Sequence, residues 1–214
     1  MADHGQGARP MLHVLQTAAR PASDAVLRAM FAARKSVFVD LLKWDVPVLD
    51  GGYEVDQFDD VYATYLVLAE PDGTHLGSAR LLPTTRPHIL DSFYADLCED
   101  APPRDADIFE ITRFCLDRRL TAHERRQVRD TLVSALVDHA LATGISAYSA
   151  IAEMGWFQQI LAFGWRCMPL GLPRIIDGAM LAALRIEITP ETPSLLESGR
   201  ATAAALRVDR RVAA

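Results

Sequence analysis

The sequence has few cysteines, and their spacing is not that of a disulfide or metal site. Only three occur in 214 residues, at Cys98, Cys115 and Cys167. No CxxC pair or Cys/His cluster is present, which excludes a disulfide scaffold and argues against zinc, so we expect no metal. Unpaired thiols are typical of a reducing compartment, and we expect a cytoplasmic protein.

Long hydrophobic runs and an excess of positive charge are also missing. No apolar segment approaches the roughly 20 residues that cross a bilayer. The start, MADHGQGARP, lacks the basic-then-apolar pattern of a secretory signal. The formal net charge of -6 argues against a general nucleic-acid binder. We therefore expect neither a membrane nor a nucleic acid as partner, although a local basic patch can still attract an acidic protein.

Glycine-rich phosphate loops are the third absence. No GxGxxG follows a predicted strand, and no Walker sequence occurs. Dinucleotide binding and P-loop nucleotide binding are therefore not expected.

The length and composition are typical of one globular domain. Half of the residues are hydrophobic and 23% are charged, as in ordinary soluble proteins. We expect a flexible tail at residues 1–10, a single domain at 11–190 and a Pro-, Ala- and Arg-rich C-terminal tail at 191–214.

The apolar periodicity predicts alternating strands and helices. A helix should begin at an N-cap, Ser23, and a long, functional loop should span residues 43–60. This order suits an α/β (α+β) fold with a mixed sheet flanked by helices. The expected strands are Met11–Gln16, Val61–Ala69, Thr74–Leu82, Ile108–Leu116, Ile145–Ala152, Trp165–Leu170 and Met180–Ile188. The further helices are Leu90–Leu97, Ala122–Thr143, which should end at Gly144, and Met154–Phe163.

Charged residues recur inside these apolar segments. Glu54, Asp56 and Asp59 lie at the end of the long loop, Arg80 lies within a strand, and Glu110 lies between two apolar residues of another. A charge on an apolar strand is costly to bury unless it is paired. The acids are either a solvated loop or a carboxylate site for a cation, and Glu110 is a candidate general base.

The strand at 108–116 contains one ambiguity of direction. By strict alternation Glu110 and Thr112 share a face and Arg113 points the other way. A β-bulge would bring all three toward one cleft. Cys115 could be a nucleophile, but no histidine partner is indicated, and we interpret it as a core thiol.

Arginines cluster at the start of the long predicted helix. With three nearby acids, the segment has a local charge of about +2. It is either a solvated helix face with salt bridges or a docking patch for an acidic or phosphate-bearing partner. The arginines are Arg118, Arg119, Arg125, Arg126 and Arg129.

Taken together, these segments resemble the acyl-homoserine-lactone synthase (autoinducer synthase) family. The similarity extends over roughly Leu27 to Gly171, and five elements in order and spacing make it specific. The one departure is Thr112, where the family usually has serine. The matching segments are Arg34-xxx-Phe38 with Trp44-Asp45, E54-x-D56-Q-F-D59, R80-L-L-P-T-T with Pro87, Phe93, and E110-I-T112-R113-F.

The resemblance implies a GNAT-like three-layer sandwich with a twisted mixed sheet flanked by helices. It implies synthesis of a quorum-sensing signal from S-adenosyl-L-methionine and an acyl-acyl-carrier protein, or less often acyl-CoA. The amine attacks the acyl thioester, and the carboxylate then displaces methylthioadenosine and closes the lactone. Adenosylmethionine is a substrate, so no cofactor is expected.

The resemblance also assigns roles to residues. Glu110 would act as the base, with Thr112 and Arg113 completing the catalytic group. The arginine patch would dock the acidic carrier protein. Adenosylmethionine would be bound by Arg34, Phe38, Trp44, Asp56, Asp59 and Arg80.

The acyl pocket would include Phe93, Ser149 and Ala150. Family members that make 3-oxo products often carry a threonine on the strand at 145–152, and here only Ser149 could replace it. We therefore expect an unsubstituted or non-oxo acyl chain.

Two other functions remain open. An ordinary GNAT N-acyltransferase would use acyl-CoA and a different amine, but the glycine-containing pyrophosphate loop of that class is absent at residues 118–126. A non-catalytic binding module would be favoured by a broken polar set, whereas every member of the set is present.

Overall fold

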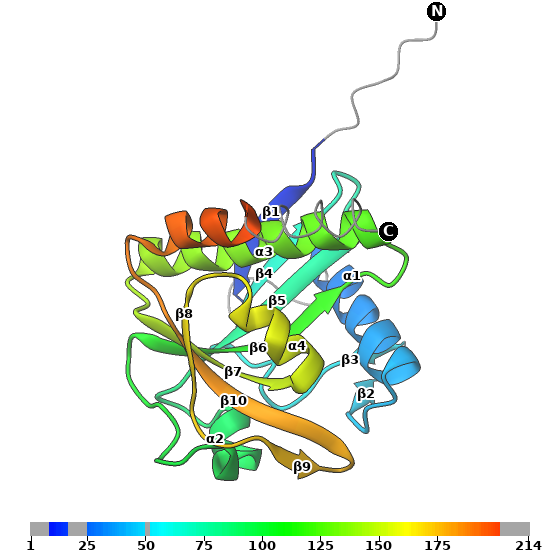
Figure 1. Cartoon of the computed structure of the whole chain (residues 1–214). Helices are drawn as coiled ribbons and strands as arrows, with labels where there is room; N and C mark the ends of the chain where they lie inside the picture. Colours follow the sequence, from blue (N-terminus) through cyan, green and yellow to red (C-terminus); the bar gives the residue numbers. More distant parts are fainter. Residues whose placement is uncertain (1–8, 17–24, 50–51, 202–214) are drawn as a thin grey trace, which may run out of the picture. The chain divides into compact units, whose positions relative to one another are not determined.

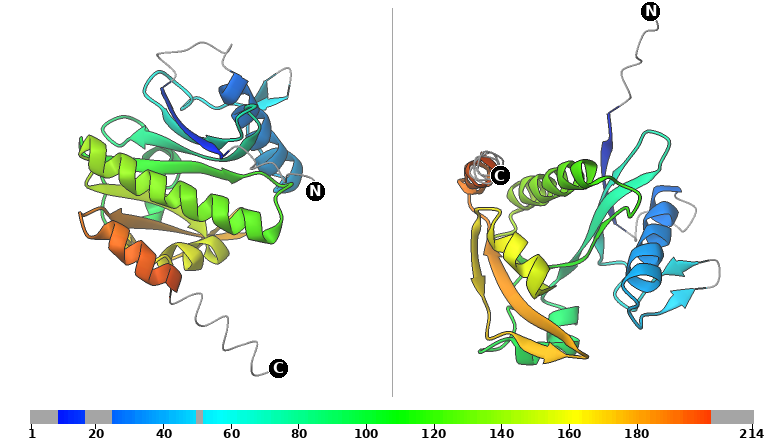
Figure 2. Two further views of the ribbon diagram at one scale, coloured as in Figure 1. Left: turned by 90° about the horizontal axis from the view of Figure 1, so that it is seen from above. Right: turned by 45° about the vertical axis from the view of Figure 1, so that its right-hand side comes forward.

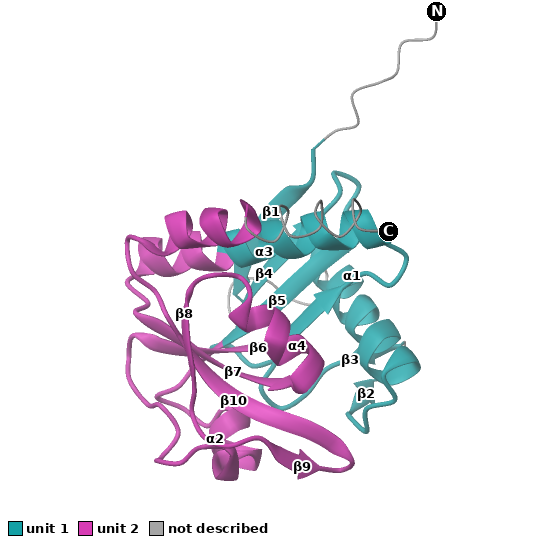
Figure 3. Cartoon of the chain, viewed as in Figure 1, with its two compact units in different colours: residues 1–81, 113–135 teal, residues 82–112, 136–214 magenta. Residues whose placement is uncertain are grey.

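The structure, a computed structural model, describes residues 9–16, 25–49 and 52–201. It contains two compact units, which Figure 3 distinguishes by colour. Unit 1 consists of residues 1–81 and 113–135, and unit 2 of residues 82–112 and 136–214. The mixed sheet flanked by helices that the sequence predicts is confirmed (Figure 1). Ser23, and most of both expected tails, lie outside the described residues.

Unit 1 is built on antiparallel strands. β1 (Met11–Gln16) pairs with β4 (Thr64–Ala69), and β4 pairs with β5 (His75–Pro83) across a turn at Gly73, where φ is +87°. Helix α1 (Ala25–Arg34) continues directly into a π-helix, η2 (Lys35–Leu41). The loop expected at 43–60 contains two short strands, β2 (Val48–Leu49) and β3 (Tyr53–Glu54), which pair with each other.

The two faces of β4 are covered by different helices. Phe31 of α1 packs edge-on against Tyr65, with ring centroids 5.9 Å apart. On the other face, Leu68 joins Leu76 and Val128, a residue of α3 (Ala122–Thr143). Since alternate strand residues point to opposite faces, α1 and the start of α3 lie on opposite sides of the unit 1 strands, as Figure 2 shows.

A β-bulge in β5 decides which side chains reach the α1 face. Leu68 pairs with Gly77, but the next pair is Ala69 with His75, so Leu76 is an extra residue. The bulge turns Leu76 toward α3 and returns His75 to the face that α1 covers. Gly77 lies where α3 comes closest, because a Cβ there would stand 2.7 Å from Val128 Cγ1.

Strand β6 (Ile108–Leu116) begins in unit 2 and ends in unit 1, and its regularity is interrupted at Arg113. Arg113 has a left-handed φ of +49°. Burial alternates regularly up to Thr112, but the next buried residue is Cys115 rather than Phe114. The irregularity that the sequence left open is therefore present, and it changes the direction of the side chains that follow.

Unit 2 contains the remaining strands. β6 pairs in parallel with β7 (Ala147–Glu153), and β7 pairs antiparallel with β10 (Ala179–Glu187). β10 also pairs with β8 (Arg166–Pro169) and with β9 (Arg174–Ile176), a strand that the sequence did not predict.

Helices cover both faces of the unit 2 strands. Leu90 of α2 (Ile89–Phe93) packs with Ile151 and Ala183, and the 3-10 turn η3 (Ala95–Leu97) adds Leu97 to this cluster. On the opposite face, Tyr148 donates a hydrogen bond to the Leu136 carbonyl of α3 at 2.9 Å. Helix α4 (Met154–Leu161) follows β7 directly.

Two segments complete the described chain. Gly144 has a φ of +76°, as expected for the residue after α3. The segment expected as a C-terminal tail begins with helical residues 192–201, in which Leu196 is buried. In the described part of the chain, no helix combines the length and hydropathy that crossing a membrane requires.

Candidate active site

Unit 1 contains a closed ring of six charged side chains, here called the charge ring. Each arginine bridges two carboxylates, and each carboxylate bridges two arginines, so positive and negative charges alternate and cancel. In order around the ring, the residues are Arg34, Glu54, Arg113, Asp56, Arg80 and Asp59.

The contacts are short, and several are bidentate. Arg34 donates to both oxygens of Asp59, at 2.7 and 2.9 Å, and its Nε donates to Glu54. Arg80 donates to both oxygens of Asp56, at 2.6 and 2.9 Å, and lies 2.8 Å from Asp59.

Arg113 closes the ring. It donates to Glu54 at 3.0 Å and to Asp56 at 2.8 Å. The planar guanidinium fork suits such paired contacts, because each one is charge-assisted and fixed in direction.

Local backbone structure holds the acids in place. Asp56 accepts a hydrogen bond from the Phe58 amide at 2.9 Å, and Asp59 accepts one from the Asp56 amide at 2.8 Å. Tyr65 of β4 donates its hydroxyl to Asp59 at 2.8 Å. The acid loop is thus bound to the sheet as well as to the arginines.

Burial makes this pairing obligatory. Burial by itself would lower the pKa of Arg34, but hydrogen bonds and charge from Asp59 and Glu54 raise that pKa above its usual value. Burial would raise the pKa of Asp59, yet Arg34 and Arg80 hold that pKa well below its usual range. These groups therefore remain ionised, and each stabilises its neighbours.

The ring adds contacts that the sequence did not specify for the acids. Asp56 and Asp59 are each paired with two arginines, so a cationic ligand would share these carboxylates with the ring. Asp59 is only 1% exposed, whereas the side chains of Asp56 and Arg113 are each 10% exposed. The accessible side of the ring is therefore the one formed by Asp56 and Arg113.

Two aromatic rings lie beside Arg113. Phe38, carried by the π-helix, stacks on Trp44 with centroids 4.7 Å apart and planes inclined by 16°. The Arg113 guanidinium carbon lies 5.7 Å from the Phe38 centroid and 5.8 Å from that of Trp44. Trp44 is 39% exposed, so part of its side chain is accessible to a ligand.

Glu110 lies in unit 2 and is fully buried. Its Oε2 accepts a hydrogen bond from the Ile89 amide at 2.8 Å, and its Oε1 accepts one from the Leu90 amide at 3.0 Å. The expected base thus caps the start of α2, and the two amides fix its direction. Thr112 is also buried, two residues further along β6.

The expected acyl pocket is only partly supported by the geometry. Ser149 pairs with Glu110, so it lies on the face that α2 covers, while Ala150 lies on the opposite face with Tyr148. A pocket on one face can include Ser149 or Ala150 but not both, because neighbouring strand residues point apart. Phe93 of α2 is exposed.

The arginine patch carries less free charge than its composition indicates. Arg119 pairs with Asp117 at 2.7 Å, and Arg129 pairs with Asp130 at 2.7 Å. Arg125 donates to the backbone carbonyls that precede α3. Within the described residues, Arg118, Arg125 and Arg126 form no ion pair, so these three carry the free charge of the patch.

Sequence reasoning missed Tyr65 as a member of the site. A signal was available, since a tyrosine in the middle of a buried apolar strand needs a partner for its hydroxyl. Cys115, by contrast, agrees with its interpretation as a core thiol, because burial raises the pKa of its thiol to about 12.

Comparison with solved structures first defines the class of fold. The chain is similar to an acyl-CoA N-acyltransferase from Pseudomonas aeruginosa, with a TM-score of 0.56 over 82% of this chain and 98% of that one. The two are 15% identical, so the likeness establishes the fold alone. The fold is that of the GNAT-like acyltransferases.

The chain belongs to the autoinducer synthase family, whose model matches residues 19–196. It is 37% identical to an acyl-homoserine-lactone synthase of Rhizobium etli, over 72% of this chain and 74% of the relative. It is 30% identical to isovaleryl-homoserine lactone synthase of Bradyrhizobium diazoefficiens, over 87% of this chain and 84% of the relative.

A solved structure agrees with this assignment. The CoA-dependent acyl-homoserine lactone synthase BjaI, with SAM and isopentyl-CoA, has a TM-score of 0.79 and 29% identity, covering 88% of both chains. The predicted family is confirmed, and the chain is an acyltransferase enzyme.

Proposed function

We propose that this enzyme joins the acyl group of a thioester donor to the amine of S-adenosylmethionine and then closes the product to an acyl-homoserine lactone. The observation that carries the proposal is the charge ring with the Phe38–Trp44 pair beside its accessible side. Family membership gives the reaction class, and this site has the chemistry that adenosylmethionine requires.

Adenosylmethionine combines an ammonium, a carboxylate and a sulfonium. Asp56 can accept from the ammonium with lone pairs that the arginines leave free, and Arg113 can donate to the carboxylate. The accessible part of Trp44 suits the sulfonium, since a cation is attracted to the face of an aromatic ring.

Arg34, Arg80, Glu54 and Asp59 act differently in this proposal. They are almost fully buried and do not reach the substrate; they hold Asp56 and Arg113 in one direction. Because the ring is neutral overall and its charges alternate, it presents both a carboxylate and a guanidinium to a substrate that carries charges of both signs.

The first chemical step forms an amide. The neutral amine attacks the acyl carbonyl, the C–N bond forms, and the C–S bond breaks. The sulfur leaves as a thiolate, which becomes the thiol on receiving the proton that the amine loses. Glu110, directly or through a water, takes the amine proton, and Thr112 completes the catalytic group with Arg113. Backbone N–H groups beside the irregularity at Arg113 would stabilise the oxyanion.

The second step closes the lactone. A carboxylate oxygen attacks the carbon bonded to the sulfonium, the C–O bond forms, and the C–S bond breaks. The sulfonium takes the bonding electron pair and leaves as neutral methylthioadenosine. No covalent enzyme intermediate and no redox reagent is required.

The donor is an acyl-acyl-carrier protein if Arg118 and Arg126 form an acidic-protein docking surface with the neighbouring arginines. One observation favours acyl-CoA as a second candidate. Two of the five arginines are neutralised by their own neighbours, and BjaI, which this chain resembles, is described as CoA-dependent.

Kinetics of Trp44 variants test the adenosylmethionine site. We expect Trp44→Ala to raise the KM for adenosylmethionine by about 5- to 30-fold, from the loss of about 1–2 kcal/mol of cation–aromatic attraction. Trp44→Phe should restore most of the affinity, and the KM for the donor should not change in either variant. An unchanged adenosylmethionine KM in Trp44→Ala would remove this role.

A further inference from the structure

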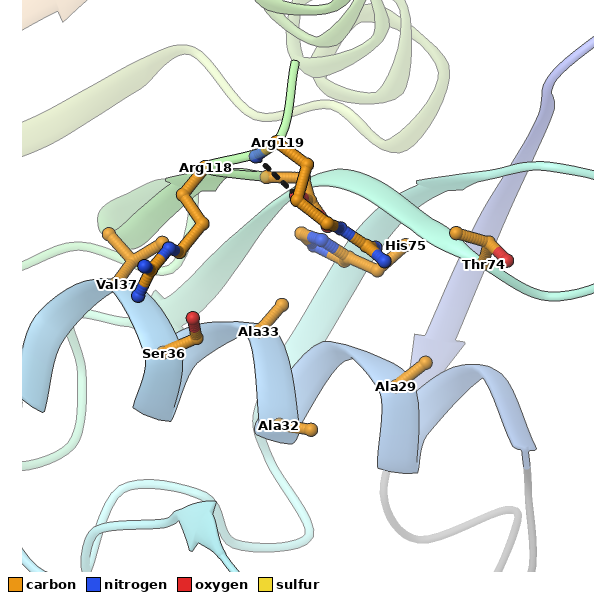
Figure 4. Close-up of a pocket in the computed structure, with 10 residues that line it drawn as sticks. Ala29, Ala32, Ala33, Ser36, Val37, Thr74, His75, Arg118 and Arg119 are labelled. Carbon is orange, nitrogen blue, oxygen red and sulfur yellow. Dashed lines mark hydrogen bonds and ion pairs between the residues drawn. The ribbon is translucent and has the colours of Figure 1, made fainter. Parts of the chain in front are cut away.

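A cavity lies in unit 1, beside α1 and the start of η2. Its volume is about 630 Å³, within the range of about 300–1,000 Å³ that is usual for small-molecule sites. Three segments line it: α1 with the start of η2, the start of β5, and the residues between β6 and α3 (Figure 4).

Small side chains form its apolar wall. Ala29, Ala32 and Ala33 line the cavity, whereas Leu27, Met30 and Arg34 of the same helix are buried on the other face. In Figure 4, Ala29 and Ala33 point toward the side that carries Arg118, Arg119 and His75. Alanines at these positions leave an apolar space where longer side chains would fill it.

The opposite wall carries a free positive charge. Asp117 accepts three hydrogen bonds from Arg119, between 2.7 and 3.0 Å, so these two charges cancel. Arg118 lines the same cavity and makes no ion pair with any described residue; Figure 4 places its guanidinium beside Ser36 and Val37 of the helix. The charged groups of the wall therefore sum to about +1.

His75 adds an unused hydrogen-bonding atom. The β5 bulge places it on the α1 face, where it is 3% exposed. Its Nε2 lies 2.9 Å from Ser78 Oγ, while its Nδ1 has no hydrogen-bond partner. Burial lowers the pKa of His75 to about 4, so the ring is neutral near pH 7. If the Ser78 hydroxyl donates to Nε2, then Nδ1 carries the proton and can donate to an anion.

We propose that this cavity binds a small amphipathic anion, with its carboxylate or phosphate on Arg118 and a short apolar body against the alanines of α1. The unpaired guanidinium suits an anionic group, and the alanine wall suits an apolar one. This site shares no residue with the charge ring, although Arg118 also belongs to the proposed donor-docking patch. The binding test uses no acyl donor and no adenosylmethionine, so its outcome is separate from that of the proposed reaction.

Titration calorimetry with the purified full chain tests the proposal. The probes are octanoate and octyl phosphate, below their micelle concentrations, with octanol lacking the charge and inorganic phosphate lacking the apolar body. We expect saturable binding of one or both anions and at least tenfold weaker binding of octanol and of phosphate. The difference between octanoate and octyl phosphate identifies the preferred head group.

Three variants locate the binding. Ala33→Leu should fill the cavity and abolish binding, and Arg118→Glu should weaken it by about tenfold or more through loss of a charge-assisted contact. Arg126→Glu, with the same charge change outside the cavity, should bind as the wild type does. Thermal unfolding verifies that each variant folds, and Ala29→Leu replaces Ala33→Leu if that variant does not.

Four results would overturn the proposal. The first three are the absence of saturable binding by either anion, binding that survives the leucine substitution that folds, and equal affinity for octanol. The fourth is equal loss in Arg126→Glu and Arg118→Glu, which would show a nonspecific charge effect.

Discussion

At the scale of single residues, the charge ring sets both stability and recognition. Asp59 is its most heavily engaged carboxylate, with contacts to Arg34, Arg80, Tyr65 and the Asp56 amide. Removing one member of a buried ion network leaves an uncompensated charge in a low dielectric, which costs more than the pair itself contributes.

Asp59→Asn should therefore destabilise the protein by about 3–5 kcal/mol. The pKa of Asp59 is lowered in the folded state, so its contribution is complete above its unfolded pKa of about 4 and is lost as the pH falls below that value. Urea unfolding at pH 7 measures the effect. Asp40→Asn is the matched control, because its pair with Lys35 is partly exposed and should contribute less than about 1 kcal/mol. Equal losses in the two variants would contradict the ring's structural role.

His75 gives the molecule a second pH dependence. The pKa is lowered to about 4 in the folded state, chiefly by burial, with Asp117 raising it and Arg119 lowering it. The pKa of a histidine in the unfolded chain is about 6.5. The stability gained by burying the neutral His75 is therefore complete above pH 6.5 and is lost as the pH falls toward 4.

We expect the wild type to lose about 3 kcal/mol more than His75→Gln between pH 7 and pH 4, from 2.5 pKa units at about 1.4 kcal/mol each. Chemical denaturation at the two pH values measures the difference. His123→Gln, at an exposed position of α3, should follow the wild type. Parallel curves for wild type and His75→Gln would show that the histidine is not buried as a neutral ring.

At the scale of elements, the stability of the fold depends on how closely a helix approaches a strand as well as on the apolar pattern. Gly77 has no side chain where α3 crosses β5, and Val128 occupies the space that a Cβ would need. Gly155, in α4, has nothing within 4 Å of an added Cβ. The two glycines therefore form a matched pair.

Gly77→Ala should destabilise the protein by about 1–3 kcal/mol, because Val128 or the helix must shift. Gly155→Ala should be neutral or stabilising by up to about 1 kcal/mol, since alanine favours a helix more than glycine does. Thermal unfolding of both variants compares them directly. A neutral Gly77→Ala would mean that α3 does not approach β5 this closely.

Periodicity predicted most elements, because each buries one face. β1, β6 and α3 have the expected bounds, and most others differ by one to three residues. The single helix expected at Leu90–Leu97 is instead divided into α2 and η3. β9 was missed because it is a three-residue strand with two exposed side chains. The register shift at Leu76 and the left-handed backbone at Arg113 leave no trace in hydrophobic alternation, since both depend on neighbouring elements.

The site was predicted as a set of residues rather than as an arrangement. Charges on apolar segments indicated that partners were needed, and Arg34, Arg80 and Arg113 are each paired with acids in the structure. The sequence does not predict that the ring closes and leaves Asp56 and Arg113 as its accessible members, because this depends on how the three arginines are brought together in the folded protein. Opposite directions for Ser149 and Ala150 follow from alternation and could have been stated from the sequence alone.

At the scale of the whole molecule, the surface charge of the arginine patch decides whether an acidic carrier protein can dock as the acyl donor. Arg126 is the cleaner position to test, because Arg125 also bonds the carbonyls of Asp117 and Arg118. We expect Arg126→Glu to raise the apparent KM for an acyl-carrier protein about tenfold and to leave the KM for adenosylmethionine unchanged. Equal effects on both constants, or none on either, would remove the docking surface and favour acyl-CoA.

The central claim is that this chain makes an acyl-homoserine lactone. The direct measurement is to incubate the purified protein with S-adenosylmethionine and a panel of acyl-CoA and acyl-carrier-protein donors, and to quantify products by mass spectrometry. We expect an acyl-homoserine lactone and methylthioadenosine in equal amounts with at least one donor, both strongly reduced in Arg113→Met. Absence of the lactone with every donor, or acylation of a different amine, would contradict it.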